Sequence, residues 1–126
     1  MNPALALSGL ADLLSALDVD VYEMWRDSIN PPCIGTYVER MPFDDTSPST
    51  FVSVVMVGMT DEQDAQSQAY KIAGDAAALV DTDHTLRGSV SSCRPVEIRN
   101  SRPLPAQDGR PRLWQVEVVW DIYLIP

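Results

Sequence analysis

Leucines recur at three- and four-residue steps along the first part of the chain, which places them on one face of a helix. Asn2 followed by Pro3 is a good helix start, because asparagine caps free backbone amides and proline lacks an amide that would have no partner there. The leucines of this face are Leu7, Leu10, Leu14 and Leu17. The pattern predicts a helix that runs to about Leu17.

Two strand-like stretches follow this helix. In residues 18–25, Val19 and Val21 alternate with aspartates, which is typical of a strand. Residues 33–40 contain β-branched and aromatic side chains and predict a second strand. The Pro31-Pro32 pair stands between them, so we expect a turn there.

Residues 51–58 form the most β-like run of the chain, and both faces of this run are apolar. One face carries Phe51, Val55 and Val57, and the other carries Val52, Val54 and Met56. A strand of this kind must be covered on both sides. We expect it either at the centre of a sheet, with helices on one face and another chain on the other, or in a sandwich.

A second helix is predicted over residues 61–80. Thr60 begins a capping-box pattern with Gln63 three residues later, and acidic residues stand at the positive end of the helix. Small residues, mostly alanine, line one face of the segment. This face is suited to close packing on a sheet.

Two further strands are predicted after this helix. The first covers residues 86–99, anchored by Val90, Val96 and Ile98, and its Pro95 indicates an edge position or a bulge. The second is the clearest of all, because residues 114–124 alternate with apolar side chains on one face.

The elements together predict an α+β fold in a single domain, residues 1–126. We expect a mixed or mostly antiparallel sheet of four or five strands with two helices packed mainly on one face. Residues 41–50 and 100–112 are predicted to be loops. Both are longer than closing a hairpin requires, and long loops of this kind are usually functional.

Charge is distributed unevenly along the chain, whose formal net charge is −9. Residues 86–112 carry six arginines against Glu97 and Asp108, a local net of +4, so the remainder carries −13. This asymmetry suits a protein whose positive surface meets the negative surface of another copy or of a partner. The alternative is that the arginines are scattered and solvated.

The sequence contains no recognisable catalytic or metal-binding constellation. His84 is the one histidine and has no ligand at metal-binding spacing, Cys33 and Cys93 stand 60 positions apart, and the six glycines form no phosphate-binding loop. Acidic pairs such as Asp44 with Asp45 leave a divalent-ion or acid-base site as a weaker alternative. We therefore expect no enzyme activity, no metal and no cofactor.

Other functional classes are disfavoured by composition. No apolar run approaches the roughly 20 residues of a membrane span, and the first residues lack the basic start of a secretory signal, so we expect a cytoplasmic protein without a membrane partner. The arginine-rich segment lacks interleaved aromatic residues, which argues against sequence-specific binding of nucleic acid.

The order of elements resembles that of the tail terminator (tail completion, or head-tail joining) proteins of long-tailed bacteriophages. The segments that carry the resemblance are residues 10–21, the turn at 28–32, the helix at 61–80, and the strand pair at 88–99 and 113–124. It implies a homo-oligomeric ring, usually a hexamer, that caps the tail tube, ends its elongation and joins it to the head connector. The implied partners are other copies of the chain, the tail tube protein and the head-tail connector protein.

The resemblance also implies a place and a mode of action. The protein would belong to the tail or neck of the virion, would be assembled in the cytoplasm of the host bacterium, and would form a ring through which genome DNA passes. The family offers no catalytic residues to carry over. Rival interpretations are another neck protein, such as a head-closure or connector-adaptor subunit, and an unrelated cytosolic interaction module.

Candidate interface residues come from the two long loops and the segment beside them. Opposite charges on the loops predict that they contact neighbouring subunits or rings, with acids of the first loop facing arginines of the second. The candidates are Phe43, Asp44, Asp45, Arg99, Arg102, Arg110 and Arg112.

Overall fold

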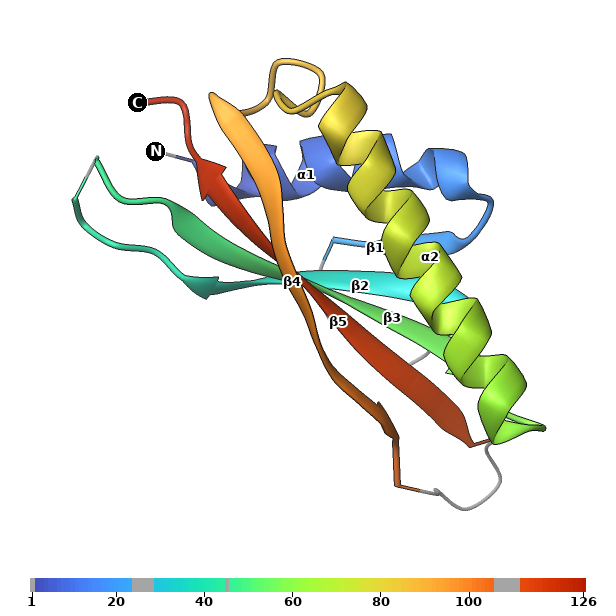
Figure 1. Ribbon diagram of the computed structural model, residues 1–126. Helices are drawn as coiled ribbons and strands as arrows, with labels where there is room; N and C mark the ends of the chain where they lie inside the picture. Colours follow the sequence, from blue (N-terminus) through green and yellow to red (C-terminus); the bar gives the residue numbers. More distant parts are fainter. Residues whose placement is uncertain (1, 24–28, 45, 106–111) are drawn as a thin grey trace.

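The computed structural model describes residues 2–23, 29–44, 46–105 and 112–126 of the protein, which form one sheet and two longer helices (Figure 1). The sheet has five strands in the order β1-β2-β3-β5-β4, and it is mixed because β1 and β2 are parallel while the other neighbours are antiparallel. The predicted α+β class, with a mixed sheet of up to five strands, is therefore confirmed. The elements are α1 (Pro3–Leu14), η1 (Ser15–Leu17), β1 (Asp20–Tyr22), β2 (Cys33–Arg40), β3 (Ser49–Gly58), α2 (Glu62–Thr82), β4 (Ser92–Pro103) and β5 (Leu113–Tyr123).

Helix α1 begins as predicted but ends earlier. The Asn2 side chain caps it by accepting a hydrogen bond from the backbone N of Ala4 at 3.0 Å. The α-helix stops at Leu14 because the chain tightens into the 3-10 turn η1, where the Ser15 hydroxyl donates to the backbone carbonyl of Asp12 at 2.6 Å. Asp18 then takes a left-handed conformation, with φ of 59°, and turns the chain toward the sheet.

The first three strands correct two predicted boundaries. Strand β1 is shorter than the predicted 18–25, because Asp18 belongs to the turn; part of that stretch lies outside the described residues. Strand β2 has the predicted bounds. Strand β3 starts at Ser49, inside the predicted loop 41–50, because Ser49 and Thr50 already pair with β5.

Strand β3 is central and buried on both sides, as its pattern predicted. On the side covered by the helices, called here the helix side, Phe51, Val55 and Val57 join the main core. On the other, called here the second side, Val52, Val54 and Met56 form a smaller core, against which Ile29, Tyr37 and Leu104 of the same chain pack. These residues are buried within a single copy, so the predicted cover on this side does not require another chain.

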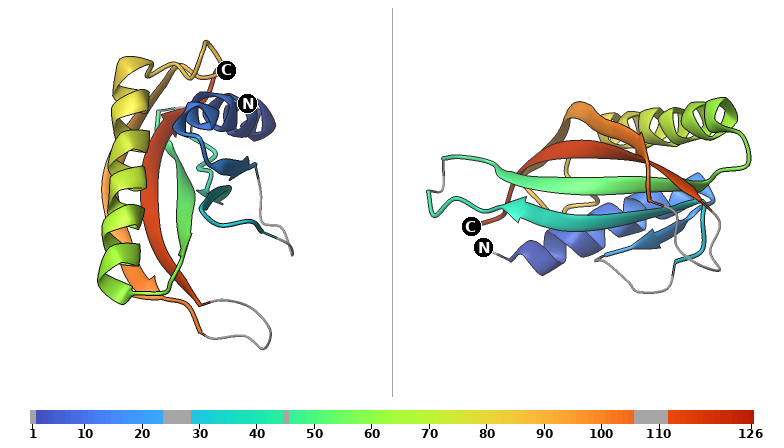
Figure 2. Two further views of the ribbon diagram at one scale, coloured as in Figure 1. Left: turned by 90° about the vertical axis from the view of Figure 1, so that its right-hand side faces the viewer. Right: turned by 90° about the horizontal axis from the view of Figure 1, so that it is seen from below.

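Both helices pack on the helix side, as predicted. Helix α2 lies along β3, β5 and β4, while α1 lies across β1 and β2 (Figure 2). The N-cap of α2 is Asp61 rather than the predicted Thr60, because the Asp61 carboxylate accepts a hydrogen bond from the backbone N of Asp64 at 3.0 Å. The buried residues of α2 are Ala65, Ala69, Ala73, Ala76 and Val80.

Strand β5 has the predicted alternation, with its even-numbered residues from Trp114 to Ile122 buried on the helix side. Strand β4 is an edge strand with a bulge at Pro95, as that proline indicated. Three expectations about β4 are wrong. The strand begins at Ser92 rather than at residue 86, because the residues just before it form turns. Val96 and Ile98 are not core anchors, being 49% and 40% exposed at the sheet edge. The strand also continues through the predicted loop 100–112 as far as Pro103, because a second bulge, with Asn100 at φ of 54°, restores its pairing with β5.

Candidate subunit interface

The connection between β2 and β3 is a hairpin tip, residues 41–48, that projects beyond the sheet (Figure 1). Phe43 is fully exposed on it. Asp44 shapes the turn: its Oδ1 accepts from the backbone N and the hydroxyl of Thr46 at 2.7 and 2.6 Å, and its Oδ2 accepts from the Ser47 hydroxyl at 2.9 Å. These hydrogen bonds lower the pKa of Asp44. The carboxylate is therefore engaged in holding the tip in shape, and the predicted Asp45 lies outside the described residues.

Arg99 is part of the sheet rather than of a loop. It stands in β4, where its Nε donates to Glu117 Oε1 at 3.0 Å and its Nη2 donates to both carboxylate oxygens of Glu39 at 2.8 and 2.9 Å. These hydrogen bonds raise the pKa of Arg99 above its usual range. Asn100 adds a donor to Glu117 at 2.8 Å. The charge of this candidate is thus neutralised within the molecule.

Sequence reasoning missed both partners of Arg99. Glu39 lies 60 positions away in β2, and Glu117 lies 18 positions away in β5. The nearby Tyr37 has its pKa raised, first by burial and then by the charges of Glu117 and Glu39. No periodicity links these residues, because only the strand order brings β2, β5 and β4 together on the second side.

Arg102 and Arg112 are exposed at the opposite end of the sheet from the hairpin tip. Neither forms an ion pair with any residue that the structure describes. The backbone carbonyl of Arg112 accepts from the N of Met59 at 2.8 Å, which fixes the start of β5. The remaining predicted arginine, Arg110, lies outside the described residues.

The two segments that the sequence predicted as partners lie far apart in one chain. Ser49, just after the hairpin tip, pairs with Ile122, whereas Gly58 at the other end of β3 pairs with Leu113. The tip therefore stands at the opposite end of the sheet from Pro103 and Leu113, where β4 ends and β5 begins (Figure 1). Contact between them requires two different copies of the chain.

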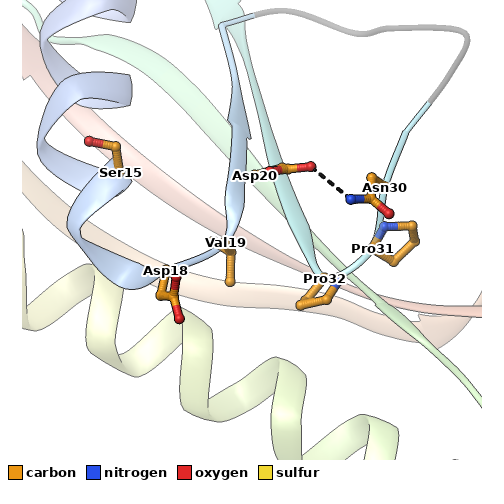
Figure 3. Close-up of a pocket in the computed structure, with 7 residues that line it drawn as sticks. All are labelled: Ser15, Asp18, Val19, Asp20, Asn30, Pro31 and Pro32. Carbon is orange, nitrogen blue, oxygen red and sulfur yellow. Dashed lines mark hydrogen bonds between the residues drawn. The ribbon is translucent and has the colours of Figure 1, made fainter.

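An acidic pocket of about 290 Å³, which no pattern in the sequence indicates, lies beside β1. Asn30 Nδ2 donates to Asp20 Oδ2 at 3.2 Å across this pocket (Figure 3). Asp18 and Asp20 are both exposed, so negative charge marks this edge of the sheet. The lining residues are Ser15, Asp18, Val19, Asp20, Asn30, Pro31 and Pro32.

The described residues hold few groups suited to other chemistry. They contain no cluster of three or more histidine, cysteine or acidic side chains able to hold a metal ion. Cys33 and Cys93 are free thiols buried on opposite sides of the sheet, so they do not form a disulfide. Neither described helix combines the length and apolar character needed to cross a membrane. Comparison with known proteins found no family model and no curated protein that matches the chain.

Proposed function

We propose that this chain is a non-catalytic structural subunit that forms a ring on the end of a phage tail tube. The ring ends elongation of the tube and joins it to the head connector, as in the tail terminator family that the chain resembles. The proposal is supported by the order of elements, in which a helix and three strands precede a second helix and a final strand pair.

The observation that carries the proposal is the exposure of Phe43 on a tip held in shape by Asp44. Leaving a phenylalanine in water forgoes about 2 kcal/mol of burial free energy, which docking on an apolar site of another protein recovers. Because the hydrogen bonds of Asp44 already order the tip, binding loses little conformational entropy. Rigid aromatic side chains of this kind are frequent hot spots of protein interfaces.

The test is a tube-capping assay with a matched pair of variants. Purified chain is added to growing tail tubes, and tube length and end-capping are measured by electron microscopy. We expect the wild-type chain to cap tube ends and Phe43→Ala to bind them at least about 10-fold more weakly, as expected for a hot-spot aromatic residue. Tyr70→Ala is the control, because Tyr70 is also a partly exposed aromatic residue but lies on α2.

Two outcomes would contradict the proposal. A wild-type chain that leaves tube growth unchanged is not a terminator, and binding to a portal ring instead would assign it to the connector-adaptor class. Equal binding by both variants and the wild type would remove Phe43 from the interface.

A further inference from the structure

Asp20 and Arg102 are exposed residues of opposite charge. They stand at the two ends of one row of paired residues that crosses the sheet. The register pairs Asp20 with Cys33, Cys33 with Met56, Met56 with Gln115, and Gln115 with Arg102. Residues directly opposite each other in neighbouring strands share one side of a sheet. Asp20 on β1 and Arg102 on β4 are therefore level with each other, on the same side, at opposite edges.

The two edges are also complementary in direction and charge. Strand β1 is parallel to β2, and three antiparallel pairings then lead across the sheet to β4, so β4 runs opposite to β1. If a second copy continues the sheet in the same orientation, its β1 meets β4 as an antiparallel pair, the more favourable kind. The β1 edge carries exposed Asp18 and Asp20. On β4, Arg94 is paired with Asp121 and Glu97 is also exposed, so Arg102 is the exposed arginine of this strand that has no ion pair among the described residues.

Strand β4 has the features of an edge that adds a strand. It is 12 residues long, and its outer edge has no neighbouring strand among the described residues. An exposed edge presents unpaired N–H and C=O groups that another strand can bind.

We propose that the β4 edge of one copy pairs with the β1 edge of the next, with Arg102 of the first beside Asp20 of the second. The contact joins two different patches, so it repeats head to tail and closes into a ring when the rotation permits. Asn30 holds one oxygen of Asp20 through its 3.2 Å hydrogen bond and so restricts the orientation of the carboxylate. This inference rests on the proposed ring and names its contact between subunits.

The first test is charge reversal followed by sedimentation velocity. We expect the wild-type chain to self-associate, Arg102→Glu and Asp20→Arg each to weaken association at least 10-fold, and the double variant to recover most of the loss. Arg87→Glu is the control, because it makes the same charge change at an exposed arginine off both edges. Unchanged association in both single variants, or a double variant weaker than either, would overturn the proposal.

The second test traps the contact covalently. A chain carrying Asp20→Cys and Arg102→Cys is oxidised mildly, and the products are separated without reductant; the native thiols are buried. We expect a ladder of cross-linked oligomers, and none from either single cysteine variant. Dimers from Arg102→Cys alone would mean that β4 pairs with β4 and would overturn the proposal.

The outcomes separate this inference from the proposed function. A wild-type chain that stays monomeric at high concentration overturns the edge pairing, yet capping of tail tubes would still support the terminator. A chain that forms the cross-linked ladder but never caps a tube keeps the edge contact and removes the terminator.

Discussion

At the scale of single residues, a buried chain of hydrogen bonds ties three strands together. Trp120 is fully buried in β5, and its Nε1 donates to the Ser53 hydroxyl of β3 at 2.8 Å. That hydroxyl lies 2.7 Å from the hydroxyl of Thr36 in β2. Buried polar groups are costly unless they are paired, so Ser53 links its two neighbours at a position where only a small hydroxyl residue satisfies both.

Ser53→Ala should therefore destabilise the protein more than Thr36→Val does. The alanine leaves the indole N–H without its acceptor, which costs about 1–3 kcal/mol, whereas valine replaces the threonine hydroxyl by a methyl group and leaves the Trp120 bond intact. Urea unfolding of the two variants measures the difference. A larger loss for Thr36→Val would show that the indole bond is not the main contribution.

The two buried thiols make stability depend on alkaline pH. Burial, and then the charge of Asp121, raises the pKa of Cys93 to about 12, and burial and Asp20 raise the pKa of Cys33 to about 11, from ordinary values of 9.0. The folded chain thus holds these protons more tightly than the unfolded chain. The contribution of the protonated thiols to the free energy of unfolding is complete below pH 9. It is lost as the pH rises toward the pKa values that the thiols have in the folded chain.

We expect the free energy of unfolding to fall between pH 8 and pH 10.5, and to fall less steeply when both cysteines are replaced by alanine. Urea midpoints at the two pH values measure both slopes, and any cavity left by alanine cancels because it does not depend on pH. Equal slopes would mean that the thiols ionise as readily in the folded chain as in the unfolded one. A thiol reagent should also react with the native protein far more slowly than with the unfolded protein.

At the scale of elements, two helical glycines have opposite roles. Gly9 of α1 lies against the turn before β4, where an added Cβ would stand 2.3 Å from Ser89 Oγ and 3.0 Å from the Leu86 carbonyl oxygen. Gly74 is exposed on α2, and nothing lies within 4 Å of its missing Cβ. Gly9 permits close packing of α1, whereas Gly74 only lowers the helix propensity of α2.

Alanine should therefore have opposite effects at the two sites. Gly74→Ala should stabilise the protein by about 0.5–1 kcal/mol, because alanine is the better helix former. Gly9→Ala should destabilise it by about 1–3 kcal/mol despite the same propensity gain, since α1 must move away from Ser89. Thermal unfolding of both variants shows whether each one is more or less stable than the wild type. A more stable Gly9→Ala variant would contradict the close approach of α1 to Ser89.

Elements whose periodicity reflects one covered face could be predicted from the sequence. The alternation of β5 and the two apolar faces of β3 gave the correct sides, because each side chain in a strand takes the side opposite its neighbours. The ends of β4, which depend on its pairing with β5, could not be predicted. The extension of β4 to Pro103 depends on bulges and on its register with Gln115 and Trp114, which leave no local signal.

The candidate interface was predictable only in part for the same reason. Phe43 stands among prolines and aspartates and was a candidate interface residue; the structure leaves it fully exposed, and its role in an interface stays a prediction. The sequence could not reveal that Arg99 is paired inside the sheet, or that Asp44 accepts hydrogen bonds from its own turn. Both depend on distances in the fold rather than on residue type.

At the scale of the whole molecule, the chain is asymmetric in two directions. Along the strands, the hairpin tip with Phe43 stands at one end and the exposed Arg102 and Arg112 at the other. Across the strands, the β1 edge with Asp18 and Asp20 faces away from the β4 edge with Arg102. In a ring, contacts across the strands would join subunits within one layer, whereas contacts along the strands would join one layer to the next.

These two kinds of contact should be separable by mutation. Phe43→Ala should weaken binding to tail tubes at least about 10-fold while leaving self-association unchanged, because Phe43 stands in the connection between β2 and β3 and belongs to neither edge strand. Arg102→Glu should reduce self-association. Its effect on tube capping should be indirect, through the loss of complete rings. Sedimentation velocity and the capping assay on the same preparations distinguish the two effects.

Both variants should unfold at the wild-type temperature, since exposed side chains away from special features change stability by about 0.5 kcal/mol or less. If Phe43→Ala also dissociated the ring, the tip would contact a neighbour within the layer, and the separation of contacts by direction would be wrong.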